Sequence, residues 1–308
     1  MALFDKQKTD LLRKIADIDG IPDGAFNIRL DGVSVKKAES ENIKIVKKTD
    51  RDGIDIYIKP YTVNENVHIP VVISKSGISE LVYNDFHVGE GAVVTIVAGC
   101  GIHNDGDCES KHDGVHSFYL EKNSKVTYIE KHVGEGDGEG GKVMNPTTYA
   151  HLGENAYMEM RTQQIGGIDS TNRTTRVELD KGATLVIGEN IMTHGHQRAT
   201  TNFVLDLNGE GSGAHVVSRS VARDDSFQSY ESLVNGNCKC SGHTECDAII
   251  MDRGVVTAIP KINANSVDAS LIHEAAIGKI AGEQLIKLMT LGLTEKEAET
   301  AIINGFLG

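Results

Sequence analysis

Tryptophan is absent from the 308-residue sequence, and aromatic residues make up only 5% of it. Large stacking platforms for bases or sugars are therefore not expected, because such platforms are built from aromatic rings. Basic residues are also scarce, since 44 acidic residues outnumber 31 lysines and arginines and leave a net charge of −13. This acidic balance disfavours nonspecific binding to nucleic acid or to an anionic membrane surface.

Long apolar runs are missing as well. No stretch approaches the roughly 20 consecutive apolar residues that a membrane-spanning helix needs. Residues 1–20 carry acids where a signal peptide would have an apolar centre. The hydrophobic content of 39% is still enough to bury a sizeable core. We therefore expect a globular protein of the cytoplasm that has no membrane partner.

Cysteines are few, with five in the whole chain, and their odd number argues against a disulfide framework. Three of the five, Cys238, Cys240 and Cys246, fall within nine residues, and a His273-Glu274 pair follows. Thiolate, imidazole and carboxylate donors together suit iron or zinc, and iron–sulfur clusters are held mainly by cysteine thiolates. The segment is therefore a candidate metal or cluster site.

The order of the donors suggests how they would meet. Along a strand, Cys238 and Cys240 would lie on one side of the backbone, because alternate side chains share a face. A bend at Gly242 would let the returning segment turn further donors toward the same pocket, namely His243, Glu245 and Cys246. The alternative is that the cysteines are buried without a ligand, as small apolar residues. Their polar neighbours favour the metal site.

A second cluster contains Cys100, His103, Cys108, His112 and His116, and its spacing resembles a compact zinc knuckle. The Asp- and Gly-rich interior of this segment favours a long solvated loop instead. No ligand role is therefore assigned to it.

Two further patterns carry no site. His194 and His196 lie two residues apart on a possible strand, where such pairs are mostly solvated. Gly136–Lys142 satisfies the glycine and lysine positions of a phosphate-binding loop, but Val143 occupies the place of the Ser or Thr that would hold magnesium. We interpret it as a flexible exposed loop.

One short pattern recurs along the middle of the chain: an apolar residue, two polar residues, Asn or Gly, Ala or Ser, any residue, and a second apolar residue. Copies begin 32, 32, 27 and 28 residues apart, at Val88, Leu120, Leu152, Leu179 and, more loosely, Leu207. Each copy predicts strand, tight turn and strand, because Asn and Gly accept the positive φ of a sharp corner. Units of about 30 residues without helices favour a right-handed parallel β-helix. An antiparallel sandwich or jelly roll is the alternative.

The N-terminal end differs from this middle. Residues 3–18 carry Leu and Ile near helical spacing and predict one amphipathic helix. Residues 20–60 are polar and predicted to be irregular, apart from a strand at Ile54–Ile58. We therefore expect residues 1–60 to precede the β-helix core, which we assign to residues 61–262.

The C-terminal end predicts a helical hairpin within residues 263–308. Residues 284–291 have apolar side chains at helical spacing and stop at a glycine. Thr294 and Glu297 then form a capping box that opens a second helix. Such terminal helices would cover the open end of a solenoid, which otherwise presents unpaired strand edges.

Several segments match one known family; they are Gly99–Gly101, Ser218–Ala222, His243–Ile250, His273–Ile280, Leu291–Leu293 and Ile303–Phe306. With these segments the chain resembles the SufB/SufD family of iron–sulfur cluster assembly scaffolds, over nearly its whole length from about residue 20. The resemblance implies a parallel β-helix core with helical flanks, a dimer of such subunits, and docking of the C-terminal helices onto an ABC-type ATPase, SufC.

The resemblance also assigns roles to residues. Cys246 is similar to the SufB cysteine implicated in cluster assembly, and His273 and Glu274 match the imidazole and acidic positions of the family. A SufD-like subunit usually lacks that cysteine, so the chain is SufB-like. It is short for a bacterial SufB, and Cys238 and Cys240 have no clear counterpart there.

We therefore predict a cytoplasmic scaffold, not an enzyme, that assembles a labile [4Fe-4S] or [2Fe-2S] cluster and passes it to recipient apo-proteins. Cys240 and Cys246 would be the principal ligands, completed by Glu245, Cys238 or Glu274, with His243 or His273 as alternatives. ATP hydrolysis would come from a SufC-like partner that docks on Leu285, Leu288, Met289 and Phe306, and the scaffold would be a homodimer.

Two other functions fit the same residues. The first is a zinc- or iron-dependent enzyme on a β-helix or jelly-roll scaffold, using the histidine-rich segment 103–116. The second is a purely structural adaptor in which the cysteines are inert.

Overall fold

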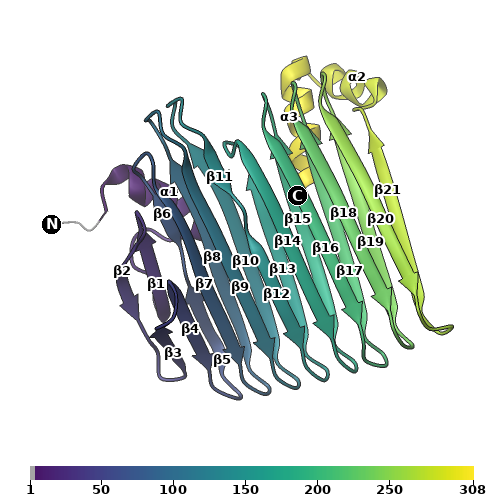
Figure 1. Ribbon diagram of the computed structural model, residues 1–308. Helices are drawn as coiled ribbons and strands as arrows, with labels where there is room; N and C mark the ends of the chain where they lie inside the picture. The colour runs from purple at the N-terminus through teal and green to yellow at the C-terminus, as the bar shows by residue number, and fades with distance from the viewer. Residues whose placement is uncertain (1–3) are drawn as a thin grey trace.

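The computed structural model describes residues 4–308, and its chain winds into a parallel β-helix (Figure 1). Successive strands alternate between two facing sheets, and strands of neighbouring coils lie side by side. The solenoid has about 8 turns, with 56% of the residues in strands and 11% in helices. The predicted fold class is thereby confirmed.

The first sheet contains, in spatial order, β2 (Val33–Ala38), β1 (Ala25–Leu30), β5 (Val63–His68), β8 (Val93–His103), β10 (Lys125–Glu135), β13 (Tyr157–Ile165), β15 (Thr184–Thr193), β17 (Gly213–Ala222), β19 (Ser241–Ile250) and β21 (Ser270–Gly278); β6 (Val71–Ile73) pairs with β1 and β8. The second contains β20 (Val255–Ala264), β18 (Phe227–Gly236), β16 (Arg198–Leu207), β14 (Ser170–Leu179), β11 (Lys142–Met144), β9 (Ser110–Leu120), β7 (Ser79–Val88), β4 (Gly53–Ile58) and β3 (Ile43–Lys47); β12 (Thr147–Leu152) pairs with β9 and β14. From β4 onward, every pairing between strands of neighbouring coils in the described chain is parallel, as in β17–β19 and β18–β20. The antiparallel sandwich or jelly roll is therefore wrong.

The repeat seen in the sequence forms a sharp corner in successive coils. Its fourth residue has a positive φ in Gly91 (65°), Asn123 (57°), Asn155 (56°) and Gly182 (66°), and the longer fifth copy uses Gly211 (75°). Each of these residues donates its backbone N–H to a carbonyl of the next coil, as Asn123 does at 2.9 Å. The corners therefore stack, and their stacking sets the strand register.

The interior of the solenoid is a continuous apolar column. Inward positions alternate with outward ones along each strand, as the pleat requires. Leu152, Leu179 and Leu207 are fully buried, and the rings of Phe86 and Phe118 stack at 4.5 Å. Each such side chain contributes about 1.5–3 kcal/mol through burial, so the column is the main source of stability.

The predicted N-terminal helix is confirmed as α1 (Lys6–Ala16), which covers the outer face of β8 and β10. It begins at Asp5, whose side chain accepts a hydrogen bond from Lys8 N. Contact with β8 is so close that a Cβ added at Gly99 would lie 2.0 Å from the Ile15 carbonyl oxygen. Glycine at this position is therefore a packing requirement of the helix.

The prediction of irregular structure for residues 20–60 is wrong outside the strand at Ile54–Ile58. This segment forms β1 to β4, in which β1–β2 and β3–β4 are antiparallel pairs. These strands are short, and β1 and β4 also pair with the later strands β5 and β7, which join the two hairpins to the solenoid.

The strands continue through β21 to Gly278, and the predicted helical hairpin follows as α2 (Gly282–Thr290) and α3 (Glu295–Leu307). Thr294 and Glu297 form the expected capping box. α3 packs through Ile303 and Leu307 on the outer side of β17, beside Val221. The last strands, β20 and β21, keep one unpaired edge each, and many of their side chains are exposed. Within residues 4–308, no helix is long and apolar enough to cross a membrane.

Candidate functional site

Cys238 and Cys240 lie in the turn between β18 and β19, close to the open end of the solenoid, and Cys246 lies in the middle of β19. Cys238 lies in the turn and is half-buried, whereas Cys240 and Cys246 are buried. Cys240 and Cys246 belong to the main apolar core, and Cys238 packs against it. All three thiols are free. Cys238 and Cys240 are neighbours, but six residues of extended chain put Cys246 roughly 20 Å from Cys240, so the structure does not bring the two predicted principal ligands together.

The single pocket expected from the sequence is not present. β19 is a regular strand, in which Thr244 and Cys246 are buried while His243 and Glu245 are only partly buried. Adjacent residues of a strand point to opposite faces. The thiol of Cys246 therefore faces the solenoid interior, and the other two side chains face outward. The bend predicted at Gly242 does not occur.

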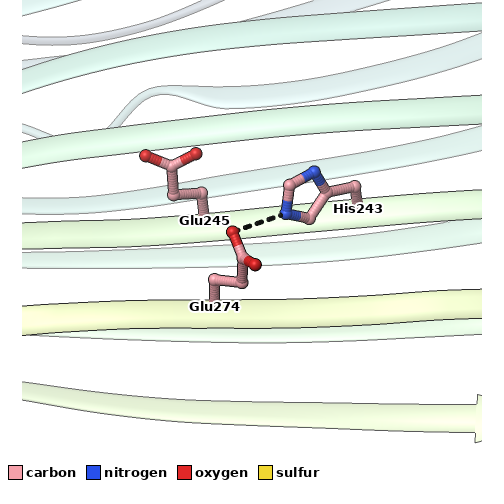
Figure 2. A group of neighbouring side chains, drawn as sticks. All are labelled: His243, Glu245 and Glu274. Atoms are coloured by element: carbon pink, nitrogen blue, oxygen red, sulfur yellow. Dashed lines mark hydrogen bonds and ion pairs between the residues drawn. The ribbon is translucent and has the colours of Figure 1, made fainter.

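On the outer face, His243, Glu245 and Glu274 come together (Figure 2). One ligand atom from each lies within 4.8 Å of the others, and His243 Nε2 is 3.2 Å from Glu274 Oε2. Parallel pairing of β19 with β21 puts Glu245 directly beside Glu274. A hydrogen bond with Asp247, with partial burial, raises the pKa of Glu245. We call these three residues the outer triad.

His273 lies apart from the outer triad. Its Nδ1 is 2.7 Å from the hydroxyl of Thr244, an inward residue of the neighbouring strand. Its Nε2 is buried without a hydrogen-bond partner. Burial and the nearby His243 lower the pKa of His273, so its imidazole is neutral at pH 7 and can accept a metal ion or a proton. His273 Nε2 is therefore a predicted donor atom on the inner face, toward which the thiol of Cys246 also points.

Two of the predicted thiol ligands, Cys238 and Cys246, are held in the protonated form. Burial, with smaller contributions from Glu189 and Asp247, raises the pKa of Cys246 to about 12. Burial and the neighbouring Cys240 also raise the pKa of Cys238. A ligand that binds these sulfurs as thiolates must therefore displace protons.

The Cys100 segment does not form a zinc knuckle. His103 turns to Asp105, at 2.8 Å, and Cys108 is exposed. His116 lies within 2.6 Å of the hydroxyl of buried Tyr128. Among residues 4–308, the outer triad is the only group of His, Cys, Asp or Glu close enough to share a metal ion.

What the structure does bring together is Cys100 with His112 and with His132, a residue that the sequence analysis did not select. Burial alone would raise the pKa of Cys100, but the charge of His112 and hydrogen bonds from both imidazoles lower it to about 7. Burial disfavours the charged form of His112, but the neighbouring Cys100 and Glu80 favour it and raise the pKa of His112 to about 10. At neutral pH, therefore, about half of Cys100 is a buried thiolate beside the imidazolium of His112.

From this pair, a row of buried polar side chains extends toward the open end; we call it the interior row. His132 Nδ1 is 3.1 Å from an Arg173 nitrogen, and Arg173 forms an ion pair with Glu130. On its other side, Arg173 Nε lies 3.4 Å from Glu189, which accepts a hydrogen bond of 2.8 Å from Ser218. Burial raises the pKa of Glu189, whereas the charges of Arg173 and His132 outweigh burial and hold that of Glu130 well below its usual range.

The interior row ends beside Cys246. Glu189, Ser218, Tyr230 and Cys246 share a cavity of about 10 Å³, just large enough for one water molecule. Ser218 and Cys246 are direct partners in the parallel pairing of β17 with β19. Polar contacts therefore connect the Cys100 thiolate with the surroundings of Cys246.

The interior row has a sequence signature that pattern reading could have found. Along β10 the buried residues are Val126, Tyr128, Glu130 and His132. Two ionisable side chains thus occupy the positions at which the alternation predicts apolar ones.

The two weak patterns of the sequence form turns. His194 and His196 lie in the turn that follows β15, and neither belongs to a group of three or more donors close enough to share a metal ion among the described residues. Gly136–Lys142 follows β10, but it is packed and not free: a Cβ at Gly138 would lie 2.4 Å from the Asp105 carbonyl carbon. The expectation of a flexible exposed loop does not account for this packing.

The predicted docking residues lie on the two C-terminal helices. Leu285, Leu288 and Phe306 are half-buried, and Met289 is 43% exposed. More apolar surface is offered by Ile286 and Leu291, which are 62% and 76% exposed and which the sequence analysis did not select. Helical spacing could have found Ile286, but not its exposure.

Comparison with known families matches residues 74–306 to the model described as "SUF system FeS cluster assembly, SufBD core domain". Similar curated proteins, each described as an iron-sulfur cluster assembly SufBD family protein, occur in three archaea. The one from Archaeoglobus fulgidus is 26% identical over 89% of this chain and 73% of its own length. Those from Methanothermobacter thermautotrophicus (strain Winter) and Methanocaldococcus jannaschii are 29% and 27% identical over 76% and 81% of this chain. The chain spans 57% of the former and 78% of the latter. Because the family model covers most of the chain, the protein belongs to the SufBD family.

Proposed function

We propose that this protein is a scaffold on which iron–sulfur clusters are assembled and then handed to recipient apo-proteins. Membership of the SufBD family supports a role in iron–sulfur cluster assembly. The observation that carries the scaffold role is that the thiol of Cys246 and the free Nε2 of His273 face the interior from β19 and β21, the last two strands of the first sheet, while Cys238 and Cys240 lie in the turn before β19. The cluster is cargo here, and the protein itself catalyses no reaction of its own.

Protonation of Cys246 gives the cluster site its lability. A thiol with a pKa of about 12, as at Cys246, binds iron only after losing its proton. Proton competition weakens the iron–sulfur bond at neutral pH and favours transfer. The neutral Nε2 of His273 is a further donor on the same face, and nitrogen ligation also loosens a cluster relative to four thiolates.

Sulfur delivery fits the other buried cysteine. A scaffold needs a nucleophile that accepts sulfur, and Cys100 is a thiolate flanked by two imidazoles. In the proposed step, the Cys100 thiolate attacks the outer sulfur of a persulfide donor; the S–S bond of the donor breaks, the donor leaves as its thiolate, and the outer sulfur with its proton remains on Cys100 as a persulfide. The side chains of the interior row then provide hydrogen-bonding groups between Cys100 and Cys246, along the direction in which the accepted sulfur would pass to Cys246.

A SufC-like ABC ATPase is the proposed partner of α2 and α3. The apolar surface of these helices supports docking there, with Met289, Ile286 and Leu291 exposed and Leu285, Leu288 and Phe306 supporting them from beneath. Nucleotide-driven closure of the ATPase would then act on α3 and through it on β17, which it contacts.

The chain is proposed to act as a SufB-like subunit in a cytoplasmic homodimer. The motif cysteine Cys246 supports the SufB-like assignment. The unpaired edges of β20 and β21 support self-association, because Ile259, Ile262 and Ile272 are all at least 40% exposed there.

Anaerobic reconstitution with iron and sulfide tests the scaffold role. The wild-type protein is expected to retain iron and acid-labile sulfide in the ratio of a cluster, read from the absorption and Mössbauer spectra. Full retention by a Cys240→Ala/Cys246→Ala variant would reject the thiol site. Zinc without sulfide would favour the alternative metal-dependent enzyme.

Docking has a separate test. Co-purification with the ATPase is expected to fall sharply after Leu288→Asp/Met289→Asp, since charges replace an apolar contact. Glu295→Gln, on the exposed first turn of α3, is the matched control. Undiminished binding by the Asp variant would reject the docking surface.

A further inference from the structure

The outer face of β19 and β21 carries three carboxylates: Glu245, Asp247 and Glu274. Among residues 4–308 no Lys or Arg forms an ion pair with them, and His243 is the ion-pair partner of Glu274. Some other acids of the outer surface do lie against cations, as Asp225 does against Arg253 at 2.6 Å. Arg219 neighbours Asp247 across the strand pair without forming an ion pair.

The pairing of Glu245 with Glu274 is unfavourable by itself. The two occupy directly opposed positions on hydrogen-bonded strands. Like charges in such positions destabilise a sheet. A cation between the two carboxylates would reverse the sign of this interaction, and the imidazole of His243 already points at Glu274.

We infer that the outer triad of His243, Glu245 and Glu274 is a mononuclear site for a divalent transition-metal ion, Fe²⁺ in the proposed function, and that it is separate from the thiol site. The donor atoms lie within 4.8 Å of one another. Metal–ligand bonds of about 2.0–2.2 Å place the donors of one ion somewhat closer together than this. Small rotations of these partly exposed side chains are enough to close the site.

The chemistry of the donors defines the ion. One imidazole and two carboxylates suit Fe²⁺, Mn²⁺ or Zn²⁺, whereas Cu⁺ would need the thiolates on the inner face. Three protein ligands leave coordination positions for water, so the ion stays exchangeable. Because Glu245 and Cys246 are adjacent residues facing opposite sides of β19, an ion held outside would lie one residue away from the cluster thiol.

This inference rests on the proposed function for the identity of the ion, but its test does not need a cluster. Anaerobic equilibrium dialysis with Fe²⁺ alone, in the absence of sulfide, is expected to give one ion per chain. Glu245→Gln/Glu274→Gln should weaken binding by roughly 100-fold, because two of three ligands lose their charge. Cys246→Ser should bind Fe²⁺ as the wild type does, and Glu231→Gln on β18 is the matched surface control.

Folding of the variant is checked at the same time. Removing the like-charge pair is expected to leave the urea midpoint of the metal-free double variant equal to or above that of the wild type. Added Fe²⁺ should then stabilise only the wild type and the controls.

Equal Fe²⁺ binding by the double Gln variant, or loss of binding in Cys246→Ser, would overturn the inference. Triad-dependent binding in a protein that never accumulates sulfide would sustain it and reject the scaffold role. Cluster assembly without triad-dependent Fe²⁺ binding would do the reverse.

Discussion

Cys100 and Cys246 are both buried in the same solenoid, yet their surroundings push their thiols in opposite directions. Two imidazoles lower the pKa of Cys100 to about 7, whereas burial next to Glu189 raises that of Cys246 to about 12. Both residues are buried, with 4% and 2% of their surface exposed, so the difference comes from the charges that the inward positions carry. The comparison shows that burial alone does not determine what a cysteine can do.

The division of roles follows from this difference. A thiolate at neutral pH is a nucleophile, so Cys100 is suited to accept sulfur. A protonated thiol binds metal only with loss of its proton, so Cys246 is suited to hold a cluster that must be released. The interior row lies between the two cysteines. Within it, Arg173 provides a positive charge between Glu130 and Glu189.

Replacing the thiolate should have the largest effect. In Cys100→Ser, uptake of sulfane sulfur from inorganic polysulfide is expected to fall by roughly 100-fold, because a hydroxyl is not ionised at neutral pH. Mass spectrometry of the anaerobic protein measures the added sulfur. Cys108→Ser removes an exposed cysteine and serves as the control. Undiminished uptake in Cys100→Ser would end the assignment of the two roles.

Breaking the interior row should cost stability. Arg173→Met leaves Glu130 and Glu189 buried without their cation, and the expected loss is about 3–5 kcal/mol in the free energy of unfolding. Urea unfolding measures it. Arg161→Met removes an exposed ion pair with Glu159 and should change stability by less than about 0.5 kcal/mol. Equal effects of the two substitutions would show that the row is not held by its charges.

Removing one imidazole should make the pKa of Cys100 more similar to that of Cys246. In His112→Asn, the pKa of Cys100 is expected to rise from about 7 to its ordinary value of 9 or above, since burial then acts against a weaker counter-charge. The ratio of iodoacetamide labelling rates at pH 7 and pH 9 reports the change. His194→Asn, in a turn, is the control. A labelling profile unchanged by His112→Asn would show that His112 does not set the state of the thiol.

The pH dependence of stability gives the smallest effect. The folded pKa of His112 is raised, so its contribution is fully present below pH 6.5 and is lost as the pH rises toward about 10. The folded pKa of Cys100 is lowered, so its contribution is present above pH 9 and is lost as the pH falls through about 7. The two trends cancel between about pH 7 and 9, and a net loss on the order of 1 kcal/mol follows between pH 9 and 10. Urea unfolding of the wild type against Cys100→Ser/His112→Asn checks it; a loss of the same size in the double variant would contradict this account.

The fold was readable from the sequence because its corners repeat. An Asn or Gly with positive φ recurs at Gly91, Asn123 and Asn155, and each marks one coil. Residues 20–60 form two local hairpins, and the Asp31-Gly32 turn between β1 and β2 is a signal that could have predicted the first; only the pairings of β1 with β5 and of β4 with β7 join segments far apart in the sequence.

Of the candidate site, the sequence predicted the donor residues but not their arrangement. Cys238, Cys240 and Cys246 were found from their spacing, but the single pocket with Glu245 and His243 assumed a bend that β19 does not make. Side chains alternate between the inner and the outer face along a strand, so whether one of them faces inward depends on its exact position in the strand. A shift of the register by one residue reverses the face of every side chain.

Site-resolved titration of the two buried thiols is the most direct test of the account. Thiolate absorbance at 240 nm, followed from pH 5 upward, would be recorded for one variant that keeps only Cys100 and another that keeps only Cys246. The account predicts a midpoint near 7 for Cys100 and no thiolate from Cys246 below pH 10. Midpoints that coincide would contradict it.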